Sequence, residues 1–407
     1  MDTSIKNLIN VKHRNKNAPS GIKLFFCISL LTCIVLSFLF LGMAHGSDAS
    51  VSFNQSGAIN TLKSAVEKFD ELENVPEKAW LRTDKRKVAE DINGILDKTI
   101  SILDVPGLVK LRQDYKKIEE AIIIEQDHIS KLRESRLLAP EGDSSFTRFI
   151  PTQRARQWTA TTTGDFDTLI ESRQENLKKY QSEMRNIEIQ MSESLSKIGI
   201  DLNPEQVEFW LSSVIGDDIL SMSIVFSNTK EVTNLLAKLT KESGENMNYA
   251  KRYYGMLVML HQMVINMQER FILKVDDDIL PKLSAFSKEA DNNIKEATSL
   301  IKSGGSRASL ESNIKANELT KQTIELYQRI VTDHRNKVSE ALKISTQEMR
   351  VAINTYNTVR LSSDVMALIR EGLDTFETIL SLQIPAADEF QNNEIREEFR
   401  KLSERMK

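Results

Sequence analysis

The chain has 407 residues, of which 28% are charged and 6% aromatic, with 15 glycines and 8 prolines. A β-sandwich or an α/β fold needs frequent turn residues, so the scarcity of glycine and proline argues against both and favours long helices. The formal net charge is −4; the first 46 residues carry five basic residues and one acidic residue, which leaves 49 Lys and Arg against 57 Asp and Glu, a net charge of −8, in the rest. A mildly acidic body argues against nucleic acid as a partner.

An uninterrupted apolar segment runs from residue 24 to residue 44 and contains no ionisable side chain. About 20 apolar residues cover the ~30 Å of hydrocarbon in a bilayer, so this segment is long enough to cross a membrane as a helix. Five basic residues precede it and Asp48 follows it, a bias that predicts a cytoplasmic N-terminus and export of everything after residue 46. The side chains expected to enter the membrane are Leu24, Phe25, Phe26, Leu30, Leu31, Ile34, Val35, Leu36, Phe38, Leu39, Phe40 and Leu41.

Two interpretations of the apolar segment remain open. A signal peptide has an apolar core of about 7–15 residues and small residues at its cleavage site. Cleavage between Gly46 and Ser47 fits that pattern, whereas the length of the apolar run favours a retained anchor. We expect an extracytoplasmic protein in the periplasm, either anchored in the inner membrane by residues 24–44 or released by cleavage near residue 46.

Both cysteines, Cys27 and Cys33, lie inside the apolar segment. The exported residues contain no cysteine, so disulfide bonds cannot stabilise them and helix packing must do so. This composition is more typical of a bacterial envelope protein than of a secreted animal domain.

From residue 58 onward, apolar residues recur at alternating steps of three and four, the spacing of a coiled-coil seam. Short helices are predicted within 47–105. A helical hairpin is predicted within 106–200, with a long loop at 139–164 between its two seams. Glu125 occupies a seam position in the first of these helices, and Arg173 occupies one in the second.

Asn203 followed by Pro204 predicts the start of the next helix, because proline is favoured at the first helical position. Its seam continues through 207–239. A further helix is expected over about 245–302, kinked or broken at Pro281, where the backbone N–H is missing and the ring clashes with the preceding turn.

The Ser-Gly-Gly-Ser sequence at 303–306 is the sharpest break in the pattern. It predicts the turn of a long helical hairpin that covers 201–383. A charged C-terminal helix is predicted within 384–407, with Glu397 and Lys401 at the spacing of a stabilising ion pair.

These elements predict an all-α fold, an elongated antiparallel coiled coil or long helical bundle after an N-terminal apolar helix. Helices of this length cannot bury their seams in a compact ball. They must pack lengthwise against one another or against a second copy.

Two groups of residues could suggest a metal site. Glu125 and His128 have the Glu-x-x-His spacing of di-iron bundles, but no other histidine has a glutamate three residues before it, so a solvated helix face is preferred. Soft thioethers beside His261 could bind copper(I), yet their spacing is equally that of a core stripe, which is preferred. These methionines are Met247, Met256, Met259, Met263 and Met267.

Two acidic runs, 216–218 and 276–278, lack the spaced oxygen ligands of a calcium loop and are interpreted as charged helix surface. The long loop mixes basic and aromatic side chains and is interpreted either as a contact for a partner or for lipid headgroups, or as a plain surface loop. The candidate contact residues are Arg148, Phe149, Arg154, Arg156 and Trp158.

The chain contains no P-loop, nucleophile-elbow or Cys-x-x-Cys motif. We therefore predict no enzymatic activity, catalytic residue, cofactor, metal ion or small-molecule substrate. The predicted function is that of a non-enzymatic coiled-coil scaffold, tether or adaptor of the bacterial envelope, which contacts protein partners or itself through its seams. Two alternatives remain open: a membrane-active helical protein, such as a pore former or channel accessory domain, and a helical sensory or ligand-binding domain.

Overall fold

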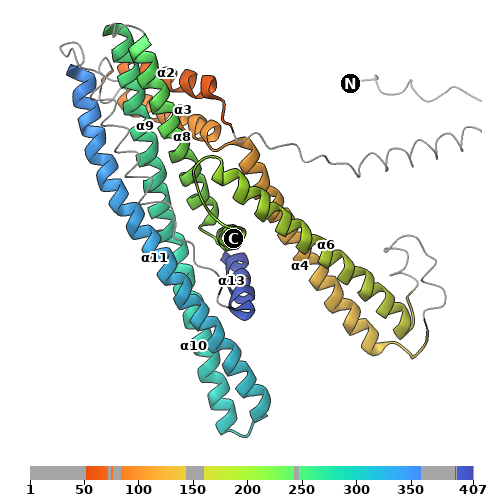
Figure 1. Ribbon diagram of the computed structural model, residues 1–407. Helices are drawn as coiled ribbons and strands as arrows, with labels where there is room; N and C mark the ends of the chain where they lie inside the picture. Colours follow the sequence, from red (N-terminus) through yellow and green to blue (C-terminus); the bar gives the residue numbers. More distant parts are fainter. Residues whose placement is uncertain are drawn as a thin grey trace, which may run out of the picture. The chain divides into compact units, whose positions relative to one another are not determined.

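The computed structural model describes residues 52–71, 75–76, 84–143, 160–242, 247–358, 390 and 392–406 (Figure 1). Over these ranges the protein is a helical bundle without strands, which confirms the all-α prediction. The helices are α2 (Gln55–Glu71), α3 (Lys85–Leu103), α4 (Pro106–Leu138), α6 (Thr163–Ser196), α7 (Pro204–Ser212), α8 (Gly216–Glu242), α9 (Met247–Lys274), the π-helical turn η3 (Val275–Ile279), α10 (Leu280–Lys302), α11 (Arg307–Thr358) and α13 (Asn393–Met406). None of these described helices combines the length and the apolar character needed to cross a bilayer.

Helices α4 and α6 pack side by side as an antiparallel pair (Figure 1). Their direction follows from two ion pairs: Arg136 near the end of α4 contacts Asp167 near the start of α6, whereas Glu125 contacts Arg173. The start of α6 is set by a capping box, in which Thr162 and Asp165 exchange side-chain and backbone hydrogen bonds.

A second antiparallel pair is formed by the 52-residue helix α11 with α10, η3 and α9 (Figure 1). Lys321 contacts Asp291 of α10, near the turn of the hairpin. Arg335, farther along α11, contacts Asp276 of η3, which is also farther from the turn. The turn between the helices contains Gly304 at φ 94°, a left-handed conformation that glycine adopts without strain.

The predicted kink or break at Pro281 takes the form of a π-helical turn. Residues 275–279 are π-helical, and Pro281 then lies in the first turn of α10. Proline has no N–H to donate to the preceding turn, and the wider π turn accommodates this loss without ending the helix. Val275 and Ile279 remain fully buried, so the turn stays in the core.

The seam expected over 207–239 is divided between two helices. Asn203 caps α7 as predicted, with a capping box to Gln206, but α7 ends at Ser212 and α8 begins at Gly216. A Cβ atom at Gly216 would lie 1.6 Å from the carbonyl oxygen of Trp210, so only glycine permits this sharp turn.

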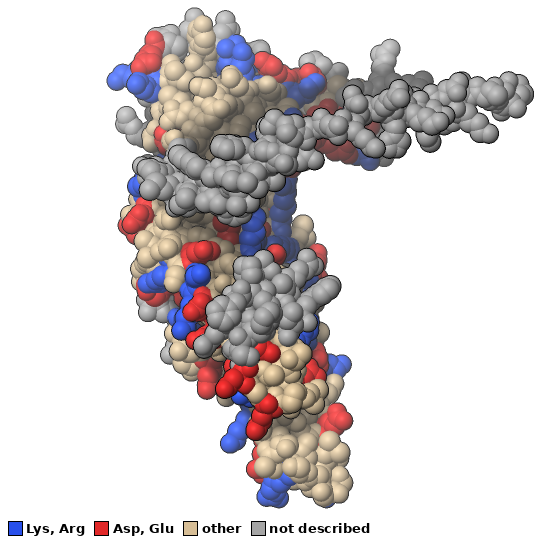
Figure 2. All heavy atoms as spheres, turned by 90° about the vertical axis from the view of Figure 1, so that its right-hand side faces the viewer, with Lys and Arg blue, Asp and Glu red and all other residues tan. Residues whose placement is uncertain are grey.

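The main core runs through the bundle, with buried side chains from α2, α3 and α4, from α6 to α9, and from α10, α11 and α13. Its largest fully buried side chains include Trp210, Tyr254 and Phe226. Lys and Arg atoms are interspersed with Asp and Glu atoms on the face drawn in Figure 2, as expected for a chain whose acidic excess is small.

The ion pair predicted between Glu397 and Lys401 is wrong. Glu397 lies 3.6 Å from Arg400, and Lys401 lies 3.8 Å from Glu398. Arg400 lies on the partly buried side of α13, which faces other helices. Glu397 pairs with this arginine and not with Lys401, which lies on the exposed face.

Candidate functional site

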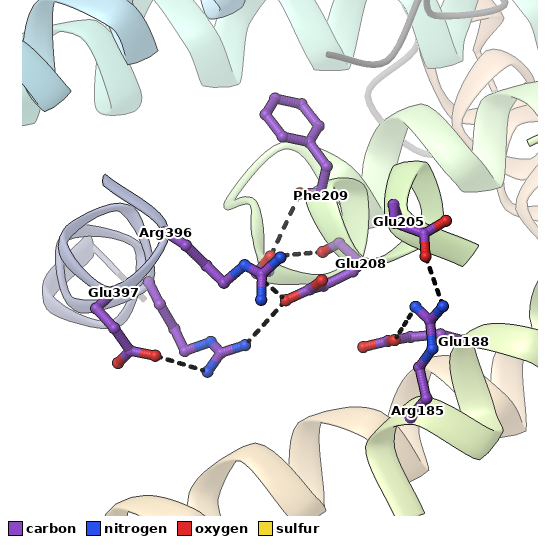
Figure 3. Close-up of polar contacts among 9 residues, drawn as sticks. Arg185, Glu188, Glu205, Glu208, Phe209, Arg396 and Glu397 are labelled. Atoms are coloured by element: carbon purple, nitrogen blue, oxygen red, sulfur yellow. Dashed lines mark hydrogen bonds and ion pairs between the residues drawn. The ribbon is translucent and has the colours of Figure 1, made fainter. Parts of the chain in front are cut away.

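A cleft of about 450 Å³ lies where α4, α6, α7 and α13 meet. Figure 3 shows that charged side chains from opposite walls point into it. The lining comprises Ile122 and Gln126 of α4, Gln181, Met184, Arg185 and Glu188 of α6, Glu205 and Glu208 of α7, and Arg396, Glu397 and Arg400 of α13. We call this the charged cleft.

The α7 wall of the charged cleft holds Glu208 in a buried position. Val207, Phe209 and Trp210 anchor α7 in the core, which leaves Glu208 only 7% exposed at the cleft edge. A carboxylate with so little access to water must be compensated by cations or hydrogen-bond donors.

Helix α13 supplies the compensating cations. Arg396 Nε and Arg400 Nη2 each lie 3.4 Å from Glu208 Oε1. The two arginines are four residues apart, so they lie on one face of the helix. Phe399 lies between the two arginines in the sequence and is fully buried. The centroid of its ring is 4.2 Å from that of Tyr327 and 5.5 Å from that of Phe209.

The α6 wall has its own ion pairs (Figure 3). Arg185 Nη2 lies 2.5 Å from Glu205 Oε1, and Arg185 Nη1 lies 3.3 Å from Glu188 Oε2. Burial, together with the nearby charge of Glu208, raises the pKa of Glu188 to about 7, although Arg185 opposes the shift. The hydrogen bond from Arg185 lowers the pKa of Glu205.

Carboxylates outnumber cations in the charged cleft. Its lining contains four glutamates and three arginines. Behind it on α4 lie buried Tyr115 and Glu119, and burial raises the pKa of the Tyr115 hydroxyl well above its usual value. Burial of Glu188, and after it the charge of Glu208, favour the protonated form of this carboxyl group.

The chemistry of the charged cleft is that of ion pairing. A carboxyl group with a pKa near 7 could act as a general acid or base, but such shifts also occur in structural ion-pair networks. The described lining contains no serine, threonine, cysteine or histidine next to Glu188. Among the described lining residues, the charged side chains engage one another in ion pairs across the cleft.

The expected solvated face at Glu125 and His128 is wrong for Glu125. This carboxylate is buried and accepts hydrogen bonds at 3.0 Å from Arg173, with Asn176 at 3.4 Å. Because Glu125 occupies a seam position, its side chain faces α6, where it contacts Arg173, a seam residue of that helix. The pair forms a polar layer across the α4–α6 interface.

Three methionines of the stripe lie in the core and Met267 packs partly buried against it, as the preferred interpretation predicts. The side chain of Met247 lies outside the described residues. Met256, Met259 and Met263 are at most 1% exposed, and His261 is buried with them. Burial lowers the pKa of His261 to about 4, which keeps its imidazole neutral. Within the described ranges, no group of three or more His, Cys, Asp or Glu side chains is placed to hold a metal ion.

The two acidic runs are engaged in ion pairs on the helix surface. Asp217 contacts Lys116 and Asp218 lies 2.5 Å from Lys274. Asp276 and Asp278 likewise pair with nearby cations of α11 and α10. This agrees with their interpretation as charged surface.

The other predicted site residues lie outside the described residues. They are the membrane segment 24–44, the cleavage site at Gly46 and Ser47, and the loop residues Arg148, Phe149, Arg154, Arg156 and Trp158. Their predictions stand as predictions.

The charged cleft itself was not predicted from the sequence. Its walls come from residues near 122, 185, 208 and 400, and no local motif connects them. The available signals were the four-residue spacing of Arg396 and Arg400 and the three-residue spacing of Glu205 and Glu208, which any charged helix surface can show. Comparisons with protein-family models, with curated proteins and with solved structures find no match to this chain.

Proposed function

We propose that this chain is a non-enzymatic, extracytoplasmic scaffold, tether or adaptor of the bacterial envelope, in which antiparallel coiled-coil helices contact a protein partner. The apolar segment 24–44 would deliver it across the inner membrane, as an anchor or as a cleaved signal peptide. The proposal depends on the structure of the far half of the α4–α6 pair, residues 124–138 and 163–176, which we call the arm.

The arm has a small hydrophobic core of its own. Ile129, Leu132, Leu169 and Ile170 form a cluster separate from the main core. Glu125 and Arg173 form the polar layer next to this cluster. Because the arm has its own small core, its packing depends little on the rest of the bundle. Its outer faces are therefore available for contacts with other molecules.

The arm also exposes large apolar side chains. Leu137 and Leu138 at the end of α4 are 80% and 85% exposed, and Ile124 at the other end of the arm is 55% exposed. Exposed apolar side chains on a coiled-coil surface are typical anchors for helix-to-helix contacts. They support a role in protein binding.

Site-specific photocrosslinking tests this proposal. A photoreactive amino acid is placed at Leu137 or Ile124 of the intact chain in its native host, with the exposed α11 residue Asn336 as the control position. We expect discrete crosslinked protein products from the arm positions and none from Asn336. Recovery of monomers alone from all positions would contradict the proposal, and a protease-protected arm fragment in membranes would favour a membrane-active protein.

The N-terminal mass of the mature chain decides between anchor and signal peptide. Cleavage after Gly46 leaves Ser47 as the first residue. An intact N-terminus in the membrane fraction would identify residues 24–44 as an anchor.

A further inference from the structure

Helix α13 contacts the rest of the bundle through a narrow face that combines two arginines with an apolar stripe. Phe399, Leu402 and Met406 are buried, and Arg396 and Arg400 flank Phe399 in sequence. We infer that the surface under α13 is an exchangeable docking site for an amphipathic helix whose docking face carries two arginines: α13 occupies it within the chain, and a partner helix with an Arg-x-x-Phe-Arg pattern takes its place. This inference rests on the proposed partner-binding function and names the chemistry of the partner.

The buried Glu208 requires an occupant with cations on its docking face. The cations that pair with buried Glu208 are the two arginines of α13. Glu188, which is 4% exposed, lies close enough for its pKa to respond to the charge of Glu208. Glu208 is buried while α13 is docked. An occupant that covered it without supplying a cation would leave a buried, uncompensated carboxylate beside a second acid, which is a strongly unfavourable arrangement.

The shape of the docking site requires an aromatic anchor. The Phe399 ring packs against the rings of both Tyr327 and Phe209, and Ser403 Oγ of α13 lies 3.4 Å from the Tyr327 hydroxyl. A buried aromatic side chain flanked by arginines is the usual composition of an interface hot spot. An amphipathic helix that lays such an anchor into a groove is a recurrent mode of peptide recognition.

The fit of α13 is incomplete, which is why we infer exchange. The distances of 3.4 Å from Arg396 and Arg400 to Glu208 exceed the ~2.7–2.9 Å of a strong charge-assisted bond. Arg400 Nε is buried without a hydrogen-bond partner among the described residues, and the charged cleft of about 450 Å³ stays open beside α13. A partner helix with longer side chains on that edge would fill the cleft and gain contacts with α6 that α13 does not make.

The length of α13 also favours exchange. A helix of 14 residues is marginal by itself in water, so α13 depends on docking for its helical structure. The antiparallel pairs α4–α6 and α10–α11 are held by contacts that do not involve α13. Undocking of α13 therefore leaves the two hairpins intact.

A peptide-binding experiment with the full chain tests the inference. The probe is a fluorescent synthetic peptide of residues 390–407, and the receptor is the full chain carrying Arg396→Glu and Arg400→Glu, which vacates the site. Because a tethered helix competes at an effective concentration of about millimolar, we expect this receptor to bind the peptide at least tenfold more tightly than the unsubstituted chain does. A peptide carrying the same two charge reversals should not bind.

A charge swap keeps the test informative if a variant is impaired in folding. The single variant Glu208→Arg repels the natural arginines of α13 and so vacates the site by another route. It should bind the charge-reversed peptide and not the natural one, with circular dichroism verifying the helix content of each chain. Equal binding of both peptides, or no binding to the vacated receptor, would overturn the inference. Concentration-dependent dimers of the unsubstituted chain that Glu208→Arg abolishes would also overturn it, because the occupant would then be a second copy.

Exchange in the otherwise unsubstituted chain is measured by thiol labelling. Cys27 and Cys33 are replaced by serine, and Ser403→Cys places a thiol in the buried face of α13. We expect the natural peptide to accelerate labelling several-fold and the charge-reversed peptide to leave it unchanged; an unchanged rate with both would overturn exchange. Crosslinking at the arm can succeed or fail independently, because it probes different helices.

Discussion

The hydroxyl oxygen of Tyr327 accepts a hydrogen bond from the backbone N–H of Val214 at 2.6 Å. The same hydroxyl lies 3.0 Å from Ser213 Oγ and 3.4 Å from Ser403 Oγ. One fully buried side chain of α11 thus joins the turn between α7 and α8 to helix α13. Burial raises the pKa of the Tyr327 hydroxyl, so it stays protonated and keeps both its donor and its acceptor roles.

Replacing Tyr327 by phenylalanine should destabilise the protein. The ring would keep its packing against Phe399, but the Val214 N–H and the Ser213 hydroxyl would lose their partner in the interior. We expect a loss of about 1–3 kcal/mol in the free energy of unfolding, measured by urea denaturation followed by circular dichroism. The control is Tyr249→Phe at a 45% exposed position, where we expect little change; a loss of similar size in both variants would contradict the role of the hydroxyl.

The ion pair between Glu125 and Arg173 should behave as a buried pair. Arg173→Leu leaves the Glu125 carboxylate without its cation inside the α4–α6 interface, and we expect a loss of about 3 kcal/mol in the free energy of unfolding. The double variant Glu125→Leu with Arg173→Leu should recover most of that stability, because an apolar pair fills the seam without an unpaired charge. Urea denaturation of the two single variants and the double variant measures the coupling.

The exposed pair of Lys131 and Asp127 on the same helix is the matched control. Its side chains are 68% and 53% exposed, so Lys131→Ala should cost less than ~1 kcal/mol. A double variant as unstable as Arg173→Leu alone would show that the seam requires the charges themselves.

The pKa of Glu188 predicts a change in stability with pH. Because its folded pKa of about 7 lies above the 4.5 of a free glutamate, the folded state binds this proton more tightly than the unfolded state does. The resulting stability is fully present below pH 4.5 and is lost as the pH rises through 7. Glu188→Gln cannot ionise, so at pH 8 it should be more stable than the unsubstituted chain, by ~2 kcal/mol, with no difference at pH 4.

Denaturation at pH 4, 6 and 8 checks this prediction. The control is Glu183→Gln, an exposed glutamate of the same helix, which should show no such pH-dependent gain. If Glu188→Gln were equally stable relative to the unsubstituted chain at all three pH values, Glu188 would not carry an extra proton in the folded state.

Gly216 should be indispensable for the turn between α7 and α8. Gly216→Ala would place its Cβ 1.6 Å from the Trp210 carbonyl oxygen, so the backbone of the turn would have to move. We expect a loss of more than ~3 kcal/mol in the free energy of unfolding or a failure to fold, measured by thermal and urea denaturation. Such a backbone movement would also pull the Val214 N–H away from the Tyr327 hydroxyl to which it donates.

Gly94 provides the opposite expectation within α3. A Cβ there meets nothing within 4 Å, so Gly94→Ala should stabilise the protein by about 0.5–1 kcal/mol through the helix preference of alanine. A similar response at both glycines would contradict the steric explanation for Gly216.

Much of the helical architecture was predictable because its signals are local. The capping pair Asn203 and Pro204 marks the start of α7, and the glycines at 303–306 mark the turn before α11. The division of the 207–239 seam at Ser213 was missed, because the seam spacing continues on both sides of the turn. Only the close approach of Gly216 to the Trp210 backbone reveals the break, and that approach depends on packing.

By itself, the sequence determined the all-α class, the seams and the apolar segment, since these depend on the spacing of residues along one helix or on an unbroken run. The tertiary structure decided which charges are buried together. Glu125 finds Arg173 on the opposite helix, and Glu208 finds Arg396 and Arg400 almost 200 residues away along the chain. Such partners are brought together by helix packing, and no spacing within one segment encodes them.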